Sequence, residues 1–479
     1  MTNNYIMKNR FIIPIMGFIG AISISSCDDF VEEVDVVNPT AEESGDIFTP
    51  TQFITGVYGR QTDYAYAFAY LALTEIVSDN SDKGSDPTDT GGDKDLFDGL
   101  TYTASSPSIE AMWTQWYKAI GRATLAIEYT TDYEGSMDAP KERLIGEAKF
   151  LRALNYFWLV RSFGDVPIQD VDLIARAPAA DVYARIEQDL MDAISALPLK
   201  SEYASQDLGR ATKGSAQGLL SKVYLYQKKW QEAADMANTV ITSNQYALEP
   251  DYATVWRETT ENGPESVFEV QARGEIPAHG VTQYSQTQGA RGPEGWGWGF
   301  NTPSEDLLNA FNSNGDSIRR DATIIFAGEV LFNGRQVSPA ASNPRYSEKA
   351  FSAANEGQGD TDKNIRVLRY AEILLIRAEA LNELGQSADA LAPLNQVRER
   401  VNLADVNTTD QVVLRNAIYL ERRLEFAMEH DRWFDLIRTG RAGEVMTALG
   451  LPFQDRNQLY PIPTGQLIQT PEMVQNPGW

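Results

Sequence analysis

The stretch "ERRLEFAMEHDRWFDLIR" near the C-terminal end concentrates charged residues on what reads as one helix. Glu421 and Glu425 are four residues apart, and Asp435 follows Arg432 by three. Two carboxylates facing each other across a cleft could serve as the acid and base of a glycoside hydrolase. Both signs of charge alternate along this stretch, however, and residues three or four apart on a helix pair readily. We therefore expect a helix stabilised by ion pairs, with no catalytic residues.

Other chemistry-bearing motifs are missing from the sequence. The two histidines, His279 and His430, are far apart, and neither has a cysteine or carboxylate at zinc-ligand spacing. We expect both on the surface. The sequence also lacks a phosphate-binding loop, a dinucleotide fingerprint and a serine nucleophile motif. It therefore predicts no cofactor and no enzyme.

An acidic stretch spans residues 78–100. It holds seven aspartates: Asp79, Asp82, Asp86, Asp89, Asp93, Asp95 and Asp98. Their spacing lacks the D-x-D-x-D-G order and the final glutamate of an EF-hand, so a solvated loop is favoured and calcium binding remains the alternative. If the loop lines a ligand site, Asp79, Lys83 and Asp86 could hydrogen-bond the hydroxyls of a sugar.

Aromatic residues are interspersed with glycine in "QYSQTQGARGPEGWGWGFNTP". Rings in such a segment suit stacking on the flat apolar face of a sugar, because they offer rigid contact area at low entropic cost. We expect Trp296 to be the main stacking platform, with Tyr284 beside it. Trp298 ranks below Trp296 as a ligand contact.

Further aromatic residues fall into two groups. Tyr64, Tyr66 and Phe97 lie near the acidic stretch and form a second candidate set. Trp113 and Trp116 lie within a helical pattern at the spacing of core positions, so we expect them to pack inside the protein.

The N-terminal segment "FIIPIMGFIGAISISSCDDF" contains Cys27, the single cysteine of the chain. The apolar run is shorter than the ~20 residues that span a membrane, and Lys8 and Arg10 precede it, which predicts a secretory signal peptide over residues 1–26. A lone cysteine cannot form an internal disulfide. "SISSC" resembles a bacterial lipobox, so Cys27 is the expected lipid-attachment site, followed by a flexible tether over residues 27–50. An ordinary signal peptide cut elsewhere remains the alternative.

Composition and periodicity predict the elements that carry these residues. A net charge of −26 disfavours nucleic acid as a partner, and 43% apolar residues suffice for a large core. Helical periodicity dominates and predicts a mainly α fold with helices or helical hairpins in five stretches: 108–129, 141–164, 181–198, 212–243 and 369–400.

The last two of these stretches read as helical hairpins. One turns near Lys228 and Lys229 and the other at Gly385, and they match each other at an offset that places Tyr224 on Leu381. This layout is typical of tetratricopeptide repeat (TPR) hairpins. The intervening residues 250–360 are irregular apart from a strand-like "ESVFEVQ".

Several phrases resemble one family when they are taken together: "AKFLRALNYFWLVRSFGDVPI", "GWGFNTPSEDLLNAF", "RYAEILLIRAEALNELG", "AIYLERRLEFAMEHDRWFDLIRTG" and "LYPIPTGQLIQTPEMVQNPGW". They resemble the SusD/RagB family of outer-membrane lipoproteins that bind glycans at the cell surface. Two departures are Thr124, where the family usually has asparagine, and "EHDR" at residues 429–432 in place of "EGHR".

This resemblance implies a fold and a function. TPR-like hairpins would support an irregular region carrying the ligand site, with an N-terminal part over residues 51–260 and a C-terminal part over 261–479 in one unit. The protein would capture an oligosaccharide or polysaccharide and deliver it to a SusC-like TonB-dependent transporter. The acidic "DDFVEEVD" after Cys27 resembles an export tag for the outer face of the outer membrane. A surface glycoside hydrolase and a TPR adaptor for proteins remain the alternatives.

Overall fold

The computed structural model describes residues 48–479 with three internal gaps, at 170–171, 274–279 and 354–362. These described residues form one compact unit. The predicted signal peptide, Cys27 and His279 lie outside them. The division of the unit near residue 260 stays a prediction.

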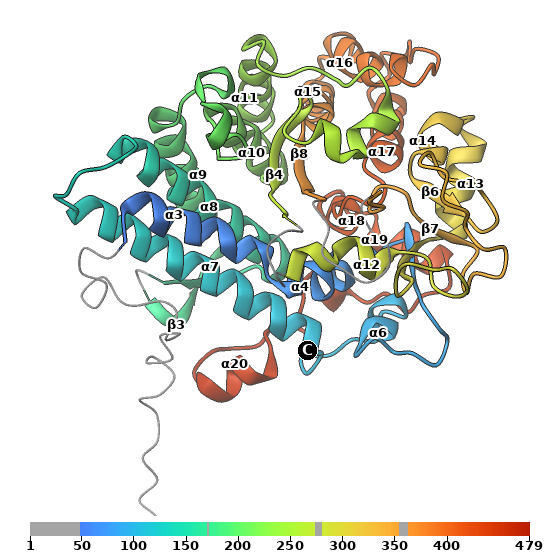
Figure 1. The fold of residues 1–479 in the computed structure, drawn as a ribbon, viewed down its shortest axis with the longest axis horizontal. Helices are drawn as coiled ribbons and strands as arrows, with labels where there is room; N and C mark the ends of the chain where they lie inside the picture. The colour runs from blue at the N-terminus through green and yellow to red at the C-terminus, as the bar shows by residue number, and fades with distance from the viewer. Residues whose placement is uncertain (1–47, 170–171, 274–279, 354–362) are drawn as a thin grey trace, which may run out of the picture. The chain divides into compact units, whose positions relative to one another are not determined.

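The prediction of a mainly α fold is confirmed (Figure 1). The helices of the first half are α3 (Pro50–Gly59), α4 (Tyr64–Ala67), α5 (Ala69–Leu71), α6 (Lys94–Asp98), α7 (Pro107–Asp132), α8 (Lys141–Phe163), α9 (Ala179–Ala196), α10 (Lys213–Tyr226) and α11 (Trp230–Thr242). Those of the second half are α12 (Tyr284–Gln288), α13 (Glu305–Ser313), α14 (Ser317–Asp321), α15 (Tyr370–Glu383), α16 (Ser387–Glu399), α17 (Gln411–Glu425), α18 (Arg432–Arg438), α19 (Ala442–Ala448) and α20 (Thr464–Gln469).

The strands of the described residues form four antiparallel two-stranded ribbons. They are β1 (Ser81–Gly84) with β5 (Phe300–Pro303), β2 (Val166–Ile168) with β3 (Asp172–Ala177), β4 (Ser266–Val270) with β8 (Ile365–Arg369), and β6 (Ile324–Phe326) with β7 (Arg345–Ser347). The strand predicted from "ESVFEVQ" is β4.

Both predicted helical hairpins are present, as α10–α11 and α15–α16, and they pack together through α11 and α15. The first turns at Lys228 and the second at Gly385, with φ of 58° and 77°. Glycine adopts this left-handed conformation without steric cost, whereas in lysine it brings Cβ close to the following carbonyl oxygen and costs free energy. Small residues such as Ala233 and Ala390 are fully buried, which lets the paired helices approach closely. The likeness to TPR repeats stays a prediction.

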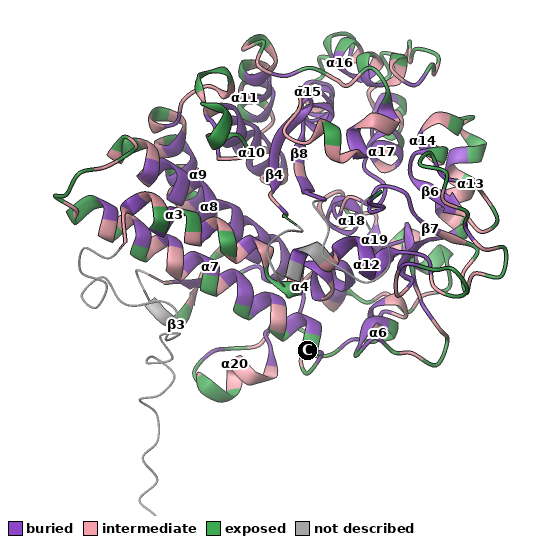
Figure 2. Cartoon of the chain, viewed as in Figure 1, coloured by how far each residue is buried: buried purple, intermediate pink, exposed green. Residues whose placement is uncertain are grey.

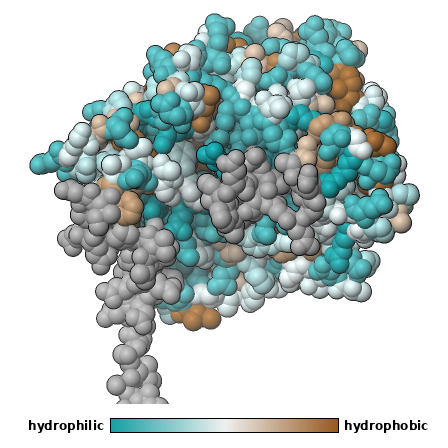
Figure 3. All heavy atoms as spheres, in the orientation of Figure 1, coloured by the Kyte–Doolittle hydropathy of each residue, from teal (hydrophilic) through white to brown (hydrophobic). Residues whose placement is uncertain are grey.

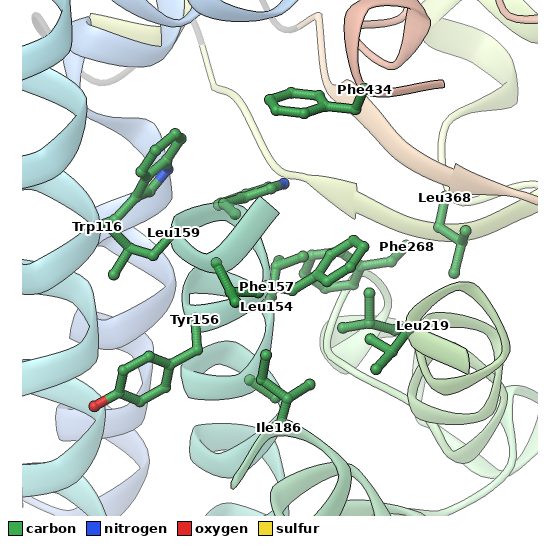
Figure 4. Packing of buried hydrophobic residues seen from close by; sticks show 14 of the residues in the cluster. Trp116, Leu154, Tyr156, Phe157, Leu159, Ile186, Leu219, Phe268, Leu368 and Phe434 are labelled. Atoms are coloured by element: carbon green, nitrogen blue, oxygen red, sulfur yellow. The ribbon is translucent and has the colours of Figure 1, made fainter. Parts of the chain in front are cut away.

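The main core surrounds α8, which is buried along most of its length between α7 and α9 (Figure 2). Figure 4 shows Phe157 of α8 packed with Phe268 of β4 and Leu219 of α10, with Trp116 of α7 nearby. Residues from both halves of the chain therefore share one apolar cluster. Trp113 and Trp116 are 4% and 0% exposed, which confirms their predicted packing role.

A smaller cluster, here called the loop core, holds the irregular region together. It consists of Ala290, Trp296, Ile325, Leu331, Val337, Tyr346 and Phe351. The ribbon β1–β5 joins this region to the acidic stretch, because Ser81 pairs with Pro303 and Gly84 with Phe300. The two irregular segments, more than 200 residues apart in sequence, are thus neighbours in the fold.

Candidate functional site

Trp296 is buried, so the expectation that it presents an exposed ring is wrong. Its side chain is 2% exposed and lies edge-on to Phe351, with ring centroids 5.2 Å apart. The backbone N–H groups of Trp296 and Gly297 both donate to the carbonyl of Ala290, which folds the segment back over the indole. Gly289 permits this closure, because a Cβ there would lie 2.5 Å from the indole ring. The alternation of glycine and tryptophan gave no sign of which ring faces inward.

Tyr284 is also buried, at 6% exposure, and its hydroxyl lies 2.7 Å from Nε2 of His430. The expected surface placement of His430 is wrong. The other ring nitrogen lies 3.1 Å from the Thr74 hydroxyl, and burial lowers the pKa of the imidazole to about 3. Both side chains therefore belong to the interior, and Tyr284 offers no face to a ligand.

The three polar residues predicted from the acidic stretch support the loop itself. Asp79 is buried and accepts two hydrogen bonds from Arg432, at 2.7 and 2.6 Å. Burial alone would raise the pKa of Asp79, but the charges of Arg432 and Arg423 outweigh it and lower the pKa to about 2. The Lys83 ammonium donates to the carbonyls of Asp86 and Asp89, and the Asp86 carboxylate accepts from the backbone and hydroxyl of Thr88. Lys83 and Asp86 therefore shape a turn, and Asp79 ties the start of the stretch to α18.

Among the described residues, no group of three or more histidine, cysteine or carboxylate side chains is placed to hold a metal ion. Within the acidic stretch, Asp93 accepts from Ser108 and from Lys94. Tyr66 and Phe97, named above as candidates, are 2% and 0% exposed and belong to the main core.

The charged residues of α17 and α18 belong to a buried ion network. It includes Arg319, Arg369, Arg400, Arg422, Arg438, Glu265, Glu372, Glu379, Glu421, Glu425, Glu429 and Asp435. Ion pairing of these charges is confirmed, but the expectation of one helix with pairs three or four residues apart is wrong. The stretch forms two helices, α17 and α18, and most partners come from other elements. Arg319 of α14 meets Glu421 at 2.6 Å, and only Arg438 with Asp435 has the i,i+3 spacing within this helix pair.

Three aromatic residues gather at a different place and remain accessible. Tyr64 is 40% exposed and stacks on Phe68 with centroids 5.9 Å apart and ring planes 26° apart. Phe68 in turn meets the half-buried Trp298 edge-on, at 6.3 Å and 86°. Two of them, Phe68 and Trp298, line a hollow of about 580 Å³, here called the aromatic groove. Its other lining residues are Asp89, Gly91, Gly92, Arg291, Gly297 and Phe300.

Local structure positions these rings. The Asp63 carboxylate caps α4 by accepting from the Ala65 N–H, and Phe68 lies in a non-helical conformation between α4 and α5. Phe300 packs edge-on against the Phe68 ring, with centroids 5.2 Å apart. The Lys94 ammonium lies 3.7 Å from the centre of the Phe68 ring. The backbone of Trp298 is held by a 2.8 Å hydrogen bond from its amide N–H to the carbonyl of Gln286. The platform is therefore rigid before any ligand arrives.

The polar edge of the aromatic groove is an ion pair. Arg291 lies 2.9 Å from the Asp89 carboxylate, and both side chains are about one third exposed, at 36% and 38%. Asp89 also accepts from Ser85 and from the backbone of Gly91. Burial would raise its pKa slightly, but the hydrogen bond from Arg291 and those other donors lower it. The edge thus presents a hydrogen-bond donor and an acceptor with no net charge.

Sequence reasoning missed Phe68 and Arg291. One signal was available for Phe68: it follows Tyr64 by four residues, so the two rings share one side of a helical turn. Nothing local marked Arg291, because its partner Asp89 is about 200 residues away.

Among the described residues, none of the helices is long and apolar enough to span a membrane. Hydrophilic residues cover most of the described surface in the view of Figure 3, and the hydrophobic ones form small separate patches.

Comparison with known proteins gives consistent matches. The family model described as "SusD family" matches residues 340–479, and "Starch-binding associating with outer membrane" matches residues 73–225. SusD-like protein P2 of Formosa agariphila is 29% identical over 98% of this chain and 99% of its own length. The starch-binding protein SusD of Bacteroides thetaiotaomicron is 25% identical over 79% of this chain and 81% of its own. The solved structure of a laminarin-binding SusD-like protein superposes with a TM-score of 0.77 at 28% identity, covering 90% of this chain and 99% of that one.

Proposed function

The chain belongs to the SusD family, and we propose that it binds a glycan at the cell surface through the aromatic groove. The observation that carries the proposal is the accessible set of Tyr64, Phe68 and Trp298 beside the Asp89–Arg291 pair. Sugars combine apolar ring faces, which stack on aromatic side chains, with hydroxyls that need both donors and acceptors. The groove supplies both kinds of contact within one hollow.

A glycan-binding screen of the soluble domain, beginning with laminarin and starch, tests this function. Trp298→Ala should weaken binding of the retained glycan by about 30-fold, the loss typical of a ~2 kcal/mol contact residue. Trp230→Ala is the matched control, because Trp230 is a half-buried tryptophan on α11, outside the groove. Equal affinities of wild type and Trp298→Ala would remove the groove as the site, and retention of no glycan at all would contradict the function.

The proposal includes the absence of catalysis. A glycoside hydrolase needs two carboxyl groups facing the substrate, about 5–10 Å apart. Asp89 is the single carboxylate in the lining of the aromatic groove, and Arg291 already pairs with it. Incubation of the purified protein with the retained glycan should therefore release no shorter sugars. Release that disappears in Asp89→Asn would overturn this part of the proposal.

Lipid anchoring at Cys27 is the second part. The residue lies outside the described residues, and the support is its place at the end of the predicted signal peptide together with the family's association with the outer membrane. Cys27→Ala should abolish labelling by a fatty-acid probe and release the protein from the membrane fraction. Label that persists on the variant would exclude Cys27 as the attachment site.

Delivery to a SusC-like TonB-dependent transporter is the third part, and the support for it is family membership. A large outer-membrane barrel protein should co-purify with the chain from the native host in mild detergent. A pull-down that recovers the chain alone, with the barrel present in the extract, would count against this partner.

A further inference from the structure

A second hollow, of about 300 Å³, lies beside the same acidic stretch and is here called the polar hollow. It is lined by Asp82, Lys83, Gly84, Ser85, Pro87, Asp98, Thr302, Pro303, Ser342, Asn343, Pro344 and Arg345. Its volume is at the lower end of the ~300–1,000 Å³ typical of ligand pockets. Unlike the aromatic groove, it contains no aromatic ring, and its apolar surface comes from rigid prolines.

Several polar groups of the polar hollow have bonding capacity to spare. Within the described part of the chain, the Asp82 carboxylate and the hydroxyls of Thr302 and Ser342 make no hydrogen bond. The two cations of the lining are committed elsewhere: Lys83 donates to two carbonyls of the turn, and Arg345 binds the Pro303 carbonyl and Glu305. The hollow therefore offers acceptors and hydroxyls without an available positive charge.

One turn, from Ser85 to Asp89, lines both hollows. Ser85 and Pro87 face the polar hollow, and Asp89 faces the aromatic groove. Ser85 donates to Asp89 at 3.2 Å, and Arg291 binds both of these side chains. Asn343 donates to the carbonyl of Ser85 at 3.2 Å, which ties the turn to the far wall of the polar hollow. The two hollows are thus fixed relative to each other by a hydrogen-bonded ridge.

We propose that the polar hollow is a second sugar subsite, which binds an uncharged segment of the same glycan beyond the residues stacked in the aromatic groove. This inference rests on the proposed function. Sugar hydroxyls can use the open bonding capacity of Asp82, Thr302 and Ser342, because they both donate and accept. A uronate or sulfate group would meet Asp82 and Asp98 with no unpaired cation to balance it. The expected ligand is a neutral oligosaccharide of several residues.

The test measures how affinity depends on glycan length, by titration calorimetry. The probes are laminaribiose and laminarihexaose, with the matching dimers and hexamers of the α-1,4-glucan and β-1,4-xylan series run beside them. Wild type should bind one of the hexamers more tightly than its dimer. Asp82→Ala should weaken hexamer binding about tenfold, the effect of losing about one hydrogen bond to a charged group, and leave the dimer within about twofold. Ser342→Leu, which fills the hollow from an exposed position, should do the same.

The controls separate failure of this inference from failure of the proposed function. Asp132→Ala removes an exposed carboxylate at the end of α7 and should leave both affinities unchanged. Trp298→Ala should weaken dimer and hexamer alike. The second subsite would be overturned, with the function intact, if Asp82→Ala and Ser342→Leu both bound the hexamer with wild-type affinity. Tighter binding of hexagalacturonate than of every neutral hexamer would overturn it as well. No binding in any of the three neutral series would overturn both.

Discussion

The buried ion network and the aromatic groove use side chains that look equally functional in the sequence, but their surroundings differ. In the network, carboxylates and guanidinium groups are buried and pair with one another. Glu425, for example, is fully buried and contacts Arg319, Arg369 and Arg400. At the groove, Trp298 and the neighbouring Tyr64 keep accessible ring surface, and the Asp89–Arg291 pair is open to solvent. Residue type indicates which chemistry is available, and bonding capacity left over after folding indicates where a ligand can use it.

The largest expected effect tests the structural role of the network. Arg369→Ala removes a guanidinium that binds Glu265, Glu425 and Glu429. Breaking a buried pair from one side leaves buried carboxylates uncompensated, which typically costs about 3–5 kcal/mol of unfolding free energy. Urea denaturation should show this loss. Arg320→Ala, which breaks the exposed pair with Asp321, should cost less than about 1 kcal/mol, and equal losses in the two variants would contradict the distinction.

Two tryptophans two residues apart provide the next comparison. Trp296→Ala leaves a cavity in the loop core and should lower the unfolding free energy by about 3 kcal/mol or more. Trp298→Ala should cost clearly less stability, because its ring is only half buried. Thermal melting of both variants beside wild type measures the difference. A wild-type melting temperature for Trp296→Ala would mean that its ring does not pack in solution as it does here.

Buried His430 predicts a pH dependence of stability. Its pKa falls from 6.5 to about 3 in the folded protein, so the unfolded chain takes up the proton first as the pH drops. The contribution of His430 to the unfolding free energy is fully present above pH 6.5 and decreases as the pH falls toward 3. At pH 5 the decrease amounts to about 2 kcal/mol. Urea denaturation at pH 7 and pH 5 should show a larger loss for wild type than for His430→Gln. Identical losses would indicate that the imidazole is not sequestered.

The smallest expected effect comes from the outer edge of the groove. Tyr64 is exposed and stacks on Phe68 from one side, so Tyr64→Ala should weaken glycan binding by about fivefold, or ~1 kcal/mol, with little change in stability. Titration of the glycan retained in the screen measures it. Tyr224→Ala, which alters a partly exposed tyrosine on α10, is the control. A loss as large as that of Trp298→Ala would place Tyr64 at the centre of the site.

The aromatic groove also explains which parts of the site could be foreseen. It lies between the acidic stretch and the Gly-rich aromatic segment, the two stretches that supplied the candidate ligand residues, and β1–β5 brings those two segments together. Trp298 was named but ranked below Trp296, and Phe68 and Arg291 were not recognised. The ranking failed because the choice between the two indoles depends on whether Phe351, 55 residues further along, covers one of them.

The sequence by itself determined the five predicted helical stretches, the two hairpins and the core role of Trp113 and Trp116. Each of these follows from periodic spacing within one element, which is local information. Only the tertiary structure decided that Trp296, Tyr284 and His430 are interior and that Phe68 and Trp298 share one hollow, with Tyr64 stacked on Phe68. In an irregular segment such as the one around Trp296, burial of a ring depends on segments that arrive from far along the chain, and no periodic pattern encodes which face they will cover.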